Sequence, residues 1–189
     1  TLRVSFMTNK HIVRLWSATE IELIKTSEEA EHPFLRRIGP DVLSESCNTE
    51  LIEKRLMSKN FKKKKASSLM LDQSLFAGIG NYLRSEILFD ANIHPDDRPL
   101  DLDKRSVQKW AKSIKNISNL AYKTGGFTVS KSVAEANKAN GEQRNSFKHA
   151  VFMRHMYKCL VCYSPIERKW YGKRKLDYCP YCQKSQKKI

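Results

Sequence analysis

The stretch that decides the fold is residues 71–88, LDQSLFAGIGNYLRSEIL, in which two apolar segments flank Gly78-Ile79-Gly80-Asn81. Glycine tolerates a positive φ and lets a ligand approach the backbone closely. Asn81 would then begin a helix whose free N–H groups and dipole favour an anion. The pattern is as typical of a plain turn between two helices as of a phosphate-binding turn. The surrounding sequence therefore has to decide between the two.

On both sides of this turn, the spacing of apolar residues predicts helices. Val107, Trp110 and Ile114 begin one face of a long amphipathic helix at the helical period. The other predicted helices cover residues 49–57, with Asn48 or Thr49 as the cap, residues 68–76 and 81–90, and a short segment around 133–139. The fold class that we expect is mainly α with a small β content.

Residues 1–16 alternate apolar and polar side chains around a turn at Thr8-Asn9-Lys10, which predicts a β-hairpin. An isolated hairpin is only marginally stable in water, so we expect these strands to complete a larger sheet that this chain lacks. Because the chain begins with Thr1 rather than Met, we expect it to be a piece of a longer protein. Ser17-Ala18-Thr19-Glu20 is a capping-box pattern that predicts a short helix over 21–24. The breakers His32-Pro33 and Gly39-Pro40 predict a linker over 25–46.

Four of the five cysteines form two CxxC pairs, Cys159/Cys162 and Cys179/Cys182, separated by sixteen residues. Two such knuckles supply four thiolates in a tetrahedron, which suits one structural Zn²⁺ ion with no open position for water. A redox CxxC and chance spacing are the alternatives. Apolar residues around a turn at Gly172-Lys173 predict a β-hairpin between the pairs. The fifth cysteine, Cys47, lies in a polar stretch and is expected to be incidental.

The charge balance points to a polyanionic partner. Lys and Arg number 35 against 20 acidic residues, which gives a net charge of +15, and the cations concentrate at 62–65 and 168–175. Such density suits phosphates, although a charged run is also compatible with a merely solvated surface. No segment approaches the ~20 apolar residues that cross a membrane. No signal peptide is visible, so we expect a cytoplasmic, nucleoid-associated protein.

The whole of residues 71–88 resembles the helix-two turn-helix signature of the formamidopyrimidine-DNA glycosylase and endonuclease VIII superfamily, and the cysteine spacing matches that family's zinc finger. Two further segments, residues 17–23 and 32–43, resemble the endonuclease VIII branch in particular. The resemblance implies the end of a β-sandwich domain over 1–24, a linker over 25–46, a helix-two turn-helix domain over 47–150 and a zinc finger over 151–189.

The resemblance also implies an activity: base-excision repair of oxidised bases, mainly pyrimidines, by a bifunctional DNA glycosylase and AP lyase. Such enzymes flip the damaged base out of the duplex. In the family, an N-terminal proline amine attacks the sugar, the adjacent glutamate handles protons and a β-domain lysine assists. No Pro-Glu pair begins this chain. We therefore expect the chain alone to be inactive and its partner to be double-stranded DNA with an oxidised base or an abasic site.

Several site residues follow from the resemblance. Asn81 matches the asparagine that holds the phosphate beside the lesion, and Arg37 matches a DNA-contacting arginine near the linker. Arg174 matches the finger arginine with an assigned role in elimination, although an arginine is a poor proton donor and a phosphate clamp is the more physical role. The expected DNA-binding set is Asn81, Arg37, Gly78, Gly80, Arg174 and Lys173. Gln73 and Glu86 are expected to be structural.

Two other readings of the same residues stay open. One is a non-catalytic zinc-ribbon module that binds nucleic acid without preferring abasic sites. The other is a protein–protein scaffold whose zinc is merely structural, which predicts no salt-dependent DNA affinity. For the leading interpretation we expect a monomer.

Overall fold

The computed structural model describes residues 1–142 and 145–187, and the chain divides into two compact units, Thr1–Arg37 and Ile38–Ile189. The division falls inside the stretch 25–46 that was expected to be a linker. Among the described residues, no helix combines the length and the apolarity needed to cross a lipid bilayer.

The first unit contains the expected hairpin. Strands β1 (Leu2–Met7) and β2 (Ile12–Trp16) pair antiparallel, with Met7 opposite Ile12 across the turn. The expected helix over 21–24 is wrong: these residues are irregular, and 3-10 helices follow at Thr26–Glu31 and Leu35–Arg37. Ser17 adopts a φ of 56°, whereas an N-cap needs an extended backbone. The apolar residues of that stretch are also exposed, so no packing stabilises a helix there.

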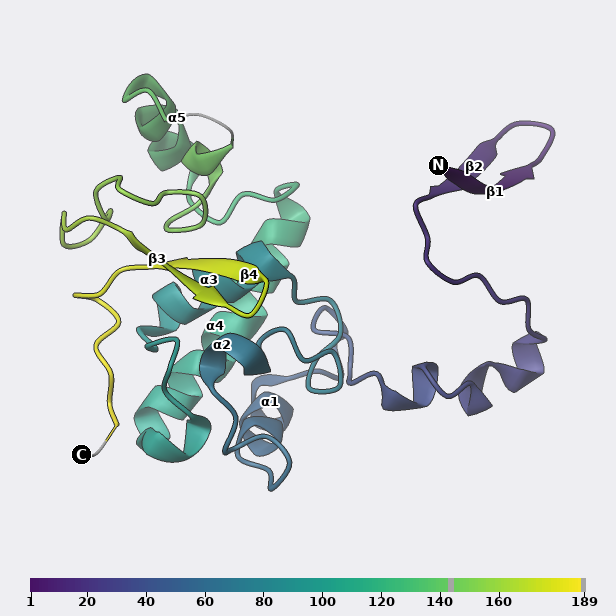
Figure 1. Ribbon diagram of the computed structural model, residues 1–189, viewed down its shortest axis with the longest axis horizontal. Helices are drawn as coiled ribbons and strands as arrows, with labels where there is room; N and C mark the ends of the chain where they lie inside the picture. Colours follow the sequence, from purple (N-terminus) through teal and green to yellow (C-terminus); the bar gives the residue numbers. More distant parts are fainter. Residues whose placement is uncertain (143–144, 188–189) are drawn as a thin grey trace. The chain divides into compact units, whose positions relative to one another are not determined.

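The second unit is a small helical domain with a β-hairpin on one side (Figure 1). Its elements in chain order are α1 (Thr49–Leu56), α2 (Ala66–Leu69), α3 (Asn81–Ala91), the 3-10 helix Pro99–Asp101, α4 (Lys104–Lys123), α5 (Lys131–Ala139), the 3-10 helix Ser146–Lys148, β3 (Glu167–Tyr171) and β4 (Arg174–Tyr178). The helices predicted near 49–57, 81–90, 107–120 and 133–139 are thereby confirmed.

Helix α3 lies at the centre of this unit. Its residues 83–89 are all buried, so the helix is covered on every side rather than along one stripe. Helix α4 packs against both α3 and α1, and Trp110 from α4 is fully buried in the shared core. Cys47 also lies fully buried in this core, where it behaves as a small apolar side chain.

The helix predicted over 68–76 is wrong in extent, because α2 ends at Leu69. The Asp72 carboxylate accepts a hydrogen bond from the Ser74 amide at 3.0 Å and another from the Ser74 hydroxyl. Such local side-chain bonds offer the backbone an alternative to the helix. The chain therefore turns here and leads into Gly78 in an irregular conformation.

Residues 39–42 pack alongside this irregular segment. The Gly39 amide donates to the Gln73 carbonyl at 2.8 Å, and the Ala77 amide donates to the Pro40 carbonyl at 3.0 Å. A Cβ on Gly39 would lie 2.5 Å from the Leu75 carbonyl oxygen, so only glycine fits this close approach. The turn before α3 is thus held firmly on one side.

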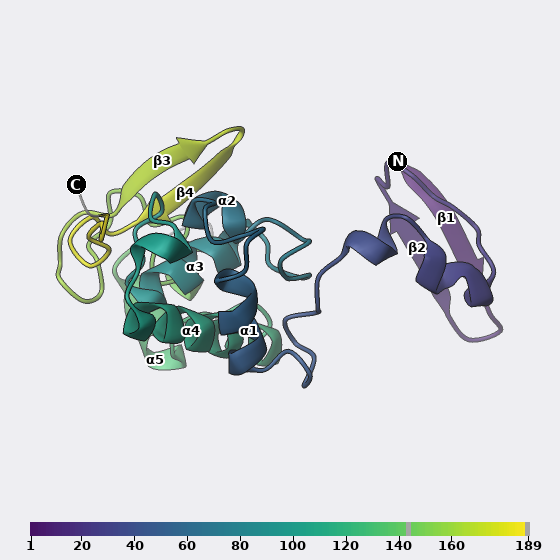
Figure 2. The ribbon, with the colours of Figure 1, turned by 90° about the horizontal axis from the view of Figure 1, so that it is seen from below.

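The β3–β4 hairpin lies across α3 in both views (Figure 2). Its register pairs Tyr171 with Arg174 and Lys169 with Leu176. One face carries Leu176 and Tyr178 into the main helical core. On the other face Arg168 donates to both oxygens of Asp177, at 2.6 and 3.0 Å. The hairpin expected between the cysteine pairs is confirmed, and the helical core holds it in a fixed orientation.

Candidate functional site

The turn that precedes α3 is braced by Gln73. Its side-chain nitrogen donates to the Ile79 carbonyl at 3.0 Å, and its side-chain oxygen accepts from the Gly78 amide at 3.1 Å. Gly78 has a φ of 94°, a conformation that glycine adopts without strain. The structural role expected for Gln73 is confirmed, and the conformation of the turn is fixed before any ligand arrives.

Gly80 contributes open space rather than an unusual conformation. Its φ is −105°, so of the two glycines only Gly78 uses the positive φ that glycine permits. A Cβ built on Gly80 would meet nothing within 4 Å. Gly80 is also the N-cap of α3, without a side-chain cap, and the first turn of α3 carries no acidic residue. The free N–H groups and the dipole of this helix end can therefore accept an anion.

Asn81 links this helix start to the hairpin. Its Nδ2 donates to the Lys175 carbonyl at 3.0 Å, and its Oδ1 accepts from Nη2 of Arg84 at 2.7 Å. The same Arg84 nitrogen donates to the Lys175 carbonyl at 2.9 Å. Asn81 and the residue that follows Arg174 are thus joined directly, although they are far apart in sequence. One amide hydrogen of Asn81 remains to serve a ligand.

Arg174 and Lys173 occupy the end of the hairpin, and both are exposed. The turn between the strands depends on Gly172, whose φ is 61°. By strand register, Arg174 shares a face with Leu176, the face that packs on the helical core. Burial lowers the pKa of Arg84, and the positive charge of Arg174 lowers it further, so Arg174 acts on the start of α3 electrostatically.

Arg37 and several cations of the basic runs have partners of their own within the chain. Arg37 is exposed and donates to the Pro33 carbonyl at 3.1 Å, and it ends the first unit. In the basic runs, three residues are already engaged: Lys64 pairs with Asp72, Lys65 with Asp96, and Arg168 with Asp177. Fewer cations of the basic runs are therefore available to an external anion than the sequence suggests, and Arg174 and Lys173 are among those without an ion pair in the described part of the chain.

Glu86 holds the segment at which the finger begins. Its buried carboxylate accepts from the Thr128 hydroxyl at 2.6 Å and from the amides of Ala150, Val151 and Phe152 at 2.7, 2.8 and 2.8 Å. The structural role expected for Glu86 is confirmed, since it joins α3 to Thr128 and to the start of the finger. Since α3 carries both Glu86 and Asn81, one helix positions this segment and the turn together.

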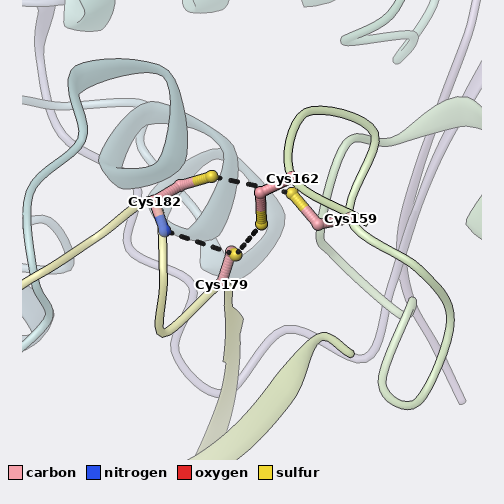
Figure 3. A group of neighbouring side chains, drawn as sticks. All are labelled: Cys159, Cys162, Cys179 and Cys182. Atoms are coloured by element: carbon pink, nitrogen blue, oxygen red, sulfur yellow. Dashed lines mark hydrogen bonds between the residues drawn. The ribbon is translucent and has the colours of Figure 1, made fainter. Parts of the chain in front are cut away.

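The four paired cysteines converge at the far end of the finger (Figure 3). Their sulfur atoms all lie within 4.8 Å of one another, with Cys159 Sγ 3.8 Å from Cys182 Sγ and Cys162 Sγ 3.4 Å from Cys179 Sγ. Burial raises the pKa of the Cys179 thiol to about 11, and a metal cation bound in the cluster would favour its thiolate. Four sulfur donors in one cluster can hold a metal ion and leave no ligand position for substrate.

Two polar side chains brace this cluster from behind. Gln183 accepts from the Cys179 amide at 2.9 Å and donates to the Ile93 carbonyl at 2.9 Å. Asn92, the left-handed C-cap of α3, donates to the Cys182 carbonyl at 3.1 Å. The second knuckle is therefore attached to the end of α3, while the hairpin touches its beginning.

Comparison with known proteins agrees with this geometry. Residues 38–133 match the family model described as the formamidopyrimidine-DNA glycosylase H2TH domain, and the match begins where the second compact unit begins. The chain belongs to the formamidopyrimidine-DNA glycosylase and endonuclease VIII superfamily. Within it, the chain is 36% identical over 183 residues to Endonuclease 8 of Salmonella arizonae, and 35% identical over 182 residues to that of Pectobacterium atrosepticum. These alignments cover 97% and 96% of this chain, and the chain spans 66% of the length of each relative.

Solved glycosylase structures share the fold. The MutM (Fpg) protein from Thermus thermophilus superposes with a TM-score of 0.65 at 29% identity, covering 82% of this chain and 57% of that one. The Lactococcus lactis formamidopyrimidine-DNA glycosylase, solved non-covalently bound to DNA containing an AP site, gives 0.66 at 26% identity, with 86% and 55% coverage. The superfamily resemblance inferred from residues 71–88 and from the cysteine spacing is thus confirmed.

Arg84 is the residue near this site that the sequence motif did not single out. It is 1% exposed, and its guanidinium reaches carbonyl oxygens from two elements, of Ser67 on α2 and Lys175 on β4. An arginine four residues into a helix is normally expected at the surface. Only the packing of α2 and β4 over α3 buries it, and no local pattern in the sequence reports that packing.

Proposed function

We propose that this chain binds damaged duplex DNA as part of a base-excision repair DNA glycosylase and AP lyase that acts on oxidised pyrimidines. The single observation that carries the proposal is the direct connection between the GIGN turn (residues 78–81) and the finger hairpin (β3 and β4). Asn81 and Arg84 both donate to the Lys175 carbonyl of this hairpin. One phosphate could then be held by the start of α3, Asn81 and Arg174 together. Membership of the superfamily supports DNA as the ligand.

In this proposal each residue has a separate task. The amides of the α3 start and the free hydrogen of Asn81 donate to the phosphate beside the lesion, while Gly78 and Gly80 let the phosphate approach the backbone. Arg174 clamps the same phosphate with a charged fork and steadies the charge that develops during elimination, and Lys173 adds a longer-range attraction. Arg37 contacts DNA near the junction of the units. The ligand is an oxidised base or an abasic site, and the working form is a monomer in the cytoplasm, associated with the nucleoid.

The finger is proposed to hold a single structural Zn²⁺ through Cys159, Cys162, Cys179 and Cys182. Zinc supplies no catalytic chemistry in such a closed four-thiolate site, and its binding energy serves folding. The residues of this chain then hold the hairpin, and so Arg174, in a fixed position against α3.

The covalent chemistry is proposed to lie outside these residues. The 189 residues contain no Pro-Glu pair, the nucleophile and acid–base pair that the superfamily uses. Borohydride reduction with an abasic duplex tests this: the chain alone is expected to form no covalent adduct, and the same chain joined to a β-domain that starts with Pro-Glu is expected to form one. An adduct with the chain alone would refute the proposed division of labour.

Binding is tested by titrating a labelled duplex that contains an abasic-site analogue against an intact duplex, over a series of salt concentrations. We expect preference for the abasic duplex, and a log Kd that rises steeply with log salt because bound phosphates release counterions. Salt-dependent binding without preference would favour a plain zinc-ribbon module. Absence of salt-dependent binding would favour a scaffold.

A further inference from the structure

Arg84 is a buried cation at the base of the candidate phosphate site, and none of the carboxylates that the structure describes is bonded to it. The side chain is 1% exposed, and its recorded partners are neutral oxygens: the carbonyls of Ser67 and Lys175 and the Oδ1 of Asn81. Among the described residues, no ion pair involves Arg84, and its Nε has no hydrogen-bond partner. A buried charge is costly unless it is paired.

The charges around Arg84 do not supply the missing partner. Asp177, the carboxylate that acts on it, is already bound through both oxygens to Arg168. Arg174 adds a second positive charge nearby, and burial together with this charge lowers the pKa of Arg84 to about 10. The arrangement therefore gathers two cations at one place and leaves the inner one uncompensated.

Another buried arginine, Arg154, has a carboxylate partner. Arg154 is 2% exposed and equally buried, but its guanidinium donates to both oxygens of Glu142, at 2.6 to 3.1 Å. The fold thus supplies a carboxylate to this buried arginine. At Arg84 it provides instead the amide of Asn81, which faces the candidate site.

We propose that the counter-ion of Arg84 is the DNA phosphate held by the GIGN turn, and that Arg84 is a positioning residue for it. This inference rests on the proposed function of the turn. By donating to Oδ1 of Asn81, Arg84 fixes the orientation of the amide, whose nitrogen donates one hydrogen to the Lys175 carbonyl and keeps the second for the phosphate. Its buried charge also attracts the phosphate through a medium of low dielectric, where attraction is strong. The outer cation, Arg174, contacts the same anion from the solvent side.

The test pairs Arg84 variants with DNA in which one phosphate at a time around an abasic-site analogue is replaced by a neutral methylphosphonate. Wild type is expected to lose affinity sharply at one position. Arg84→Gln removes the charge and should weaken binding to unmodified DNA by roughly 10- to 100-fold, which corresponds to a charged hydrogen bond. We call the loss of affinity caused by the methylphosphonate at that position the methylphosphonate penalty, and it should be much smaller for Arg84→Gln than for wild type. Arg84→Lys keeps the charge and should retain most of the penalty.

The matched control is Arg154→Gln combined with Glu142→Gln, which removes a buried guanidinium together with its carboxylate. It should keep the full wild-type methylphosphonate penalty, even if its melting temperature falls. An Arg84→Gln penalty equal to that of wild type would refute the inference while leaving the phosphate-binding turn intact. If wild type itself shows no position-specific penalty, the proposed role of the turn fails first.

A second measurement on free protein does not depend on DNA. Inorganic phosphate should raise the melting temperature of wild type in proportion to its binding, because a ligand that binds only the folded state stabilises it. The shift should be clearly smaller for Arg84→Gln than for wild type and for the Arg154/Glu142 control. Equal shifts in all three proteins would contradict the assignment of Arg84 as the partner of the anion.

Discussion

Replacing Glu86 by Gln should uncouple the finger from the helical unit. The Glu86 carboxylate accepts four hydrogen bonds, three of them from the consecutive amides of residues 150–152, and the side chain is only 2% exposed. Glutamine keeps the shape but turns one of the two acceptor oxygens into a donor. Two of the four donors would then face an N–H₂ group, and the other two would face a neutral oxygen.

The size of the effect follows from these bonds. A hydrogen bond to a charged group contributes about 1.5–3 kcal/mol, and a buried donor left without a partner costs a similar amount. Two lost bonds, moderated by local relaxation, give a decrease of roughly 3–5 kcal/mol in the free energy of unfolding. Since whole domains are stable by about 5–15 kcal/mol, the variant should still fold but with little margin.

The assay combines urea unfolding, followed by the circular dichroism of the helices, with hydrogen exchange of the amides of residues 150–152 measured by mass spectrometry. Exchange there should accelerate more than in α4, since the bonds to Glu86 protect this loop directly. Glu135→Gln on the exposed surface of α5 is the control and should change stability by less than about 0.5 kcal/mol. A loss below about 1 kcal/mol in Glu86→Gln, with unchanged exchange, would refute the reasoning.

Three further outcomes are expected. Cys179→Ser should lose bound zinc, as measured by atomic emission. The finger of this variant should become sensitive to protease while α4 stays protected. Retention of zinc would contradict the four-thiolate assignment. Burial lowers the pKa of His149, against a raising influence of Glu86, so the fold prefers the neutral ring. The stability that this preference contributes is complete above about pH 6.5 and is lost as the pH falls, because the unfolded chain then binds the proton more readily. His149→Gln should accordingly flatten the acid side of the stability–pH curve, although His94, whose pKa burial also lowers, should leave part of the slope. Finally, Cys47 is 0% exposed and burial raises its pKa, so its thiol should not react in the native protein. Cys47→Ala should therefore leave the number of thiols that react with a disulfide reagent unchanged in the native protein and reduce it in denaturant. A difference in the native protein would show that the core opens.

Much of the fold could be predicted from local patterns. The period of Val107 to Ile114, the CxxC spacing and the break at Gly78 each reflect short-range rules of helix, metal site and turn, and the structure follows them. The two helix predictions that were wrong also have a physical explanation. Residues 70–76 are apolar enough for a helix, but the bonds of Asp72 and Gln73 stabilise a turn instead. The predicted helix over 21–24 has apolar residues without a surface to bury them on.

Some features of the candidate site could likewise be predicted from the sequence, and others could not. Asn81, Arg174 and the four cysteines could be identified from motifs, because a motif records which residue types the chemistry needs. Their mutual arrangement could not: the bond from Asn81 to the Lys175 carbonyl spans most of the unit's sequence. Among the described residues, the lack of a carboxylate bonded to Arg84 likewise depends on packing between distant segments, whereas the pairing of Arg168 with Asp177 follows from the register of the hairpin. Sequence composition alone counts Arg84 and Arg168 simply as positive charges.

The central claim is that the GIGN turn and the finger hairpin hold one phosphate between them, and a double-mutant cycle tests it most directly. Affinities for an abasic-site duplex would be measured for wild type, Asn81→Ala, Arg174→Ala and the double variant at one salt concentration. Each single variant is expected to lose roughly 1–3 kcal/mol of binding, and the double variant to lose clearly less than their sum, because both side chains serve the same anion. Wild-type affinity in both single variants would contradict the account.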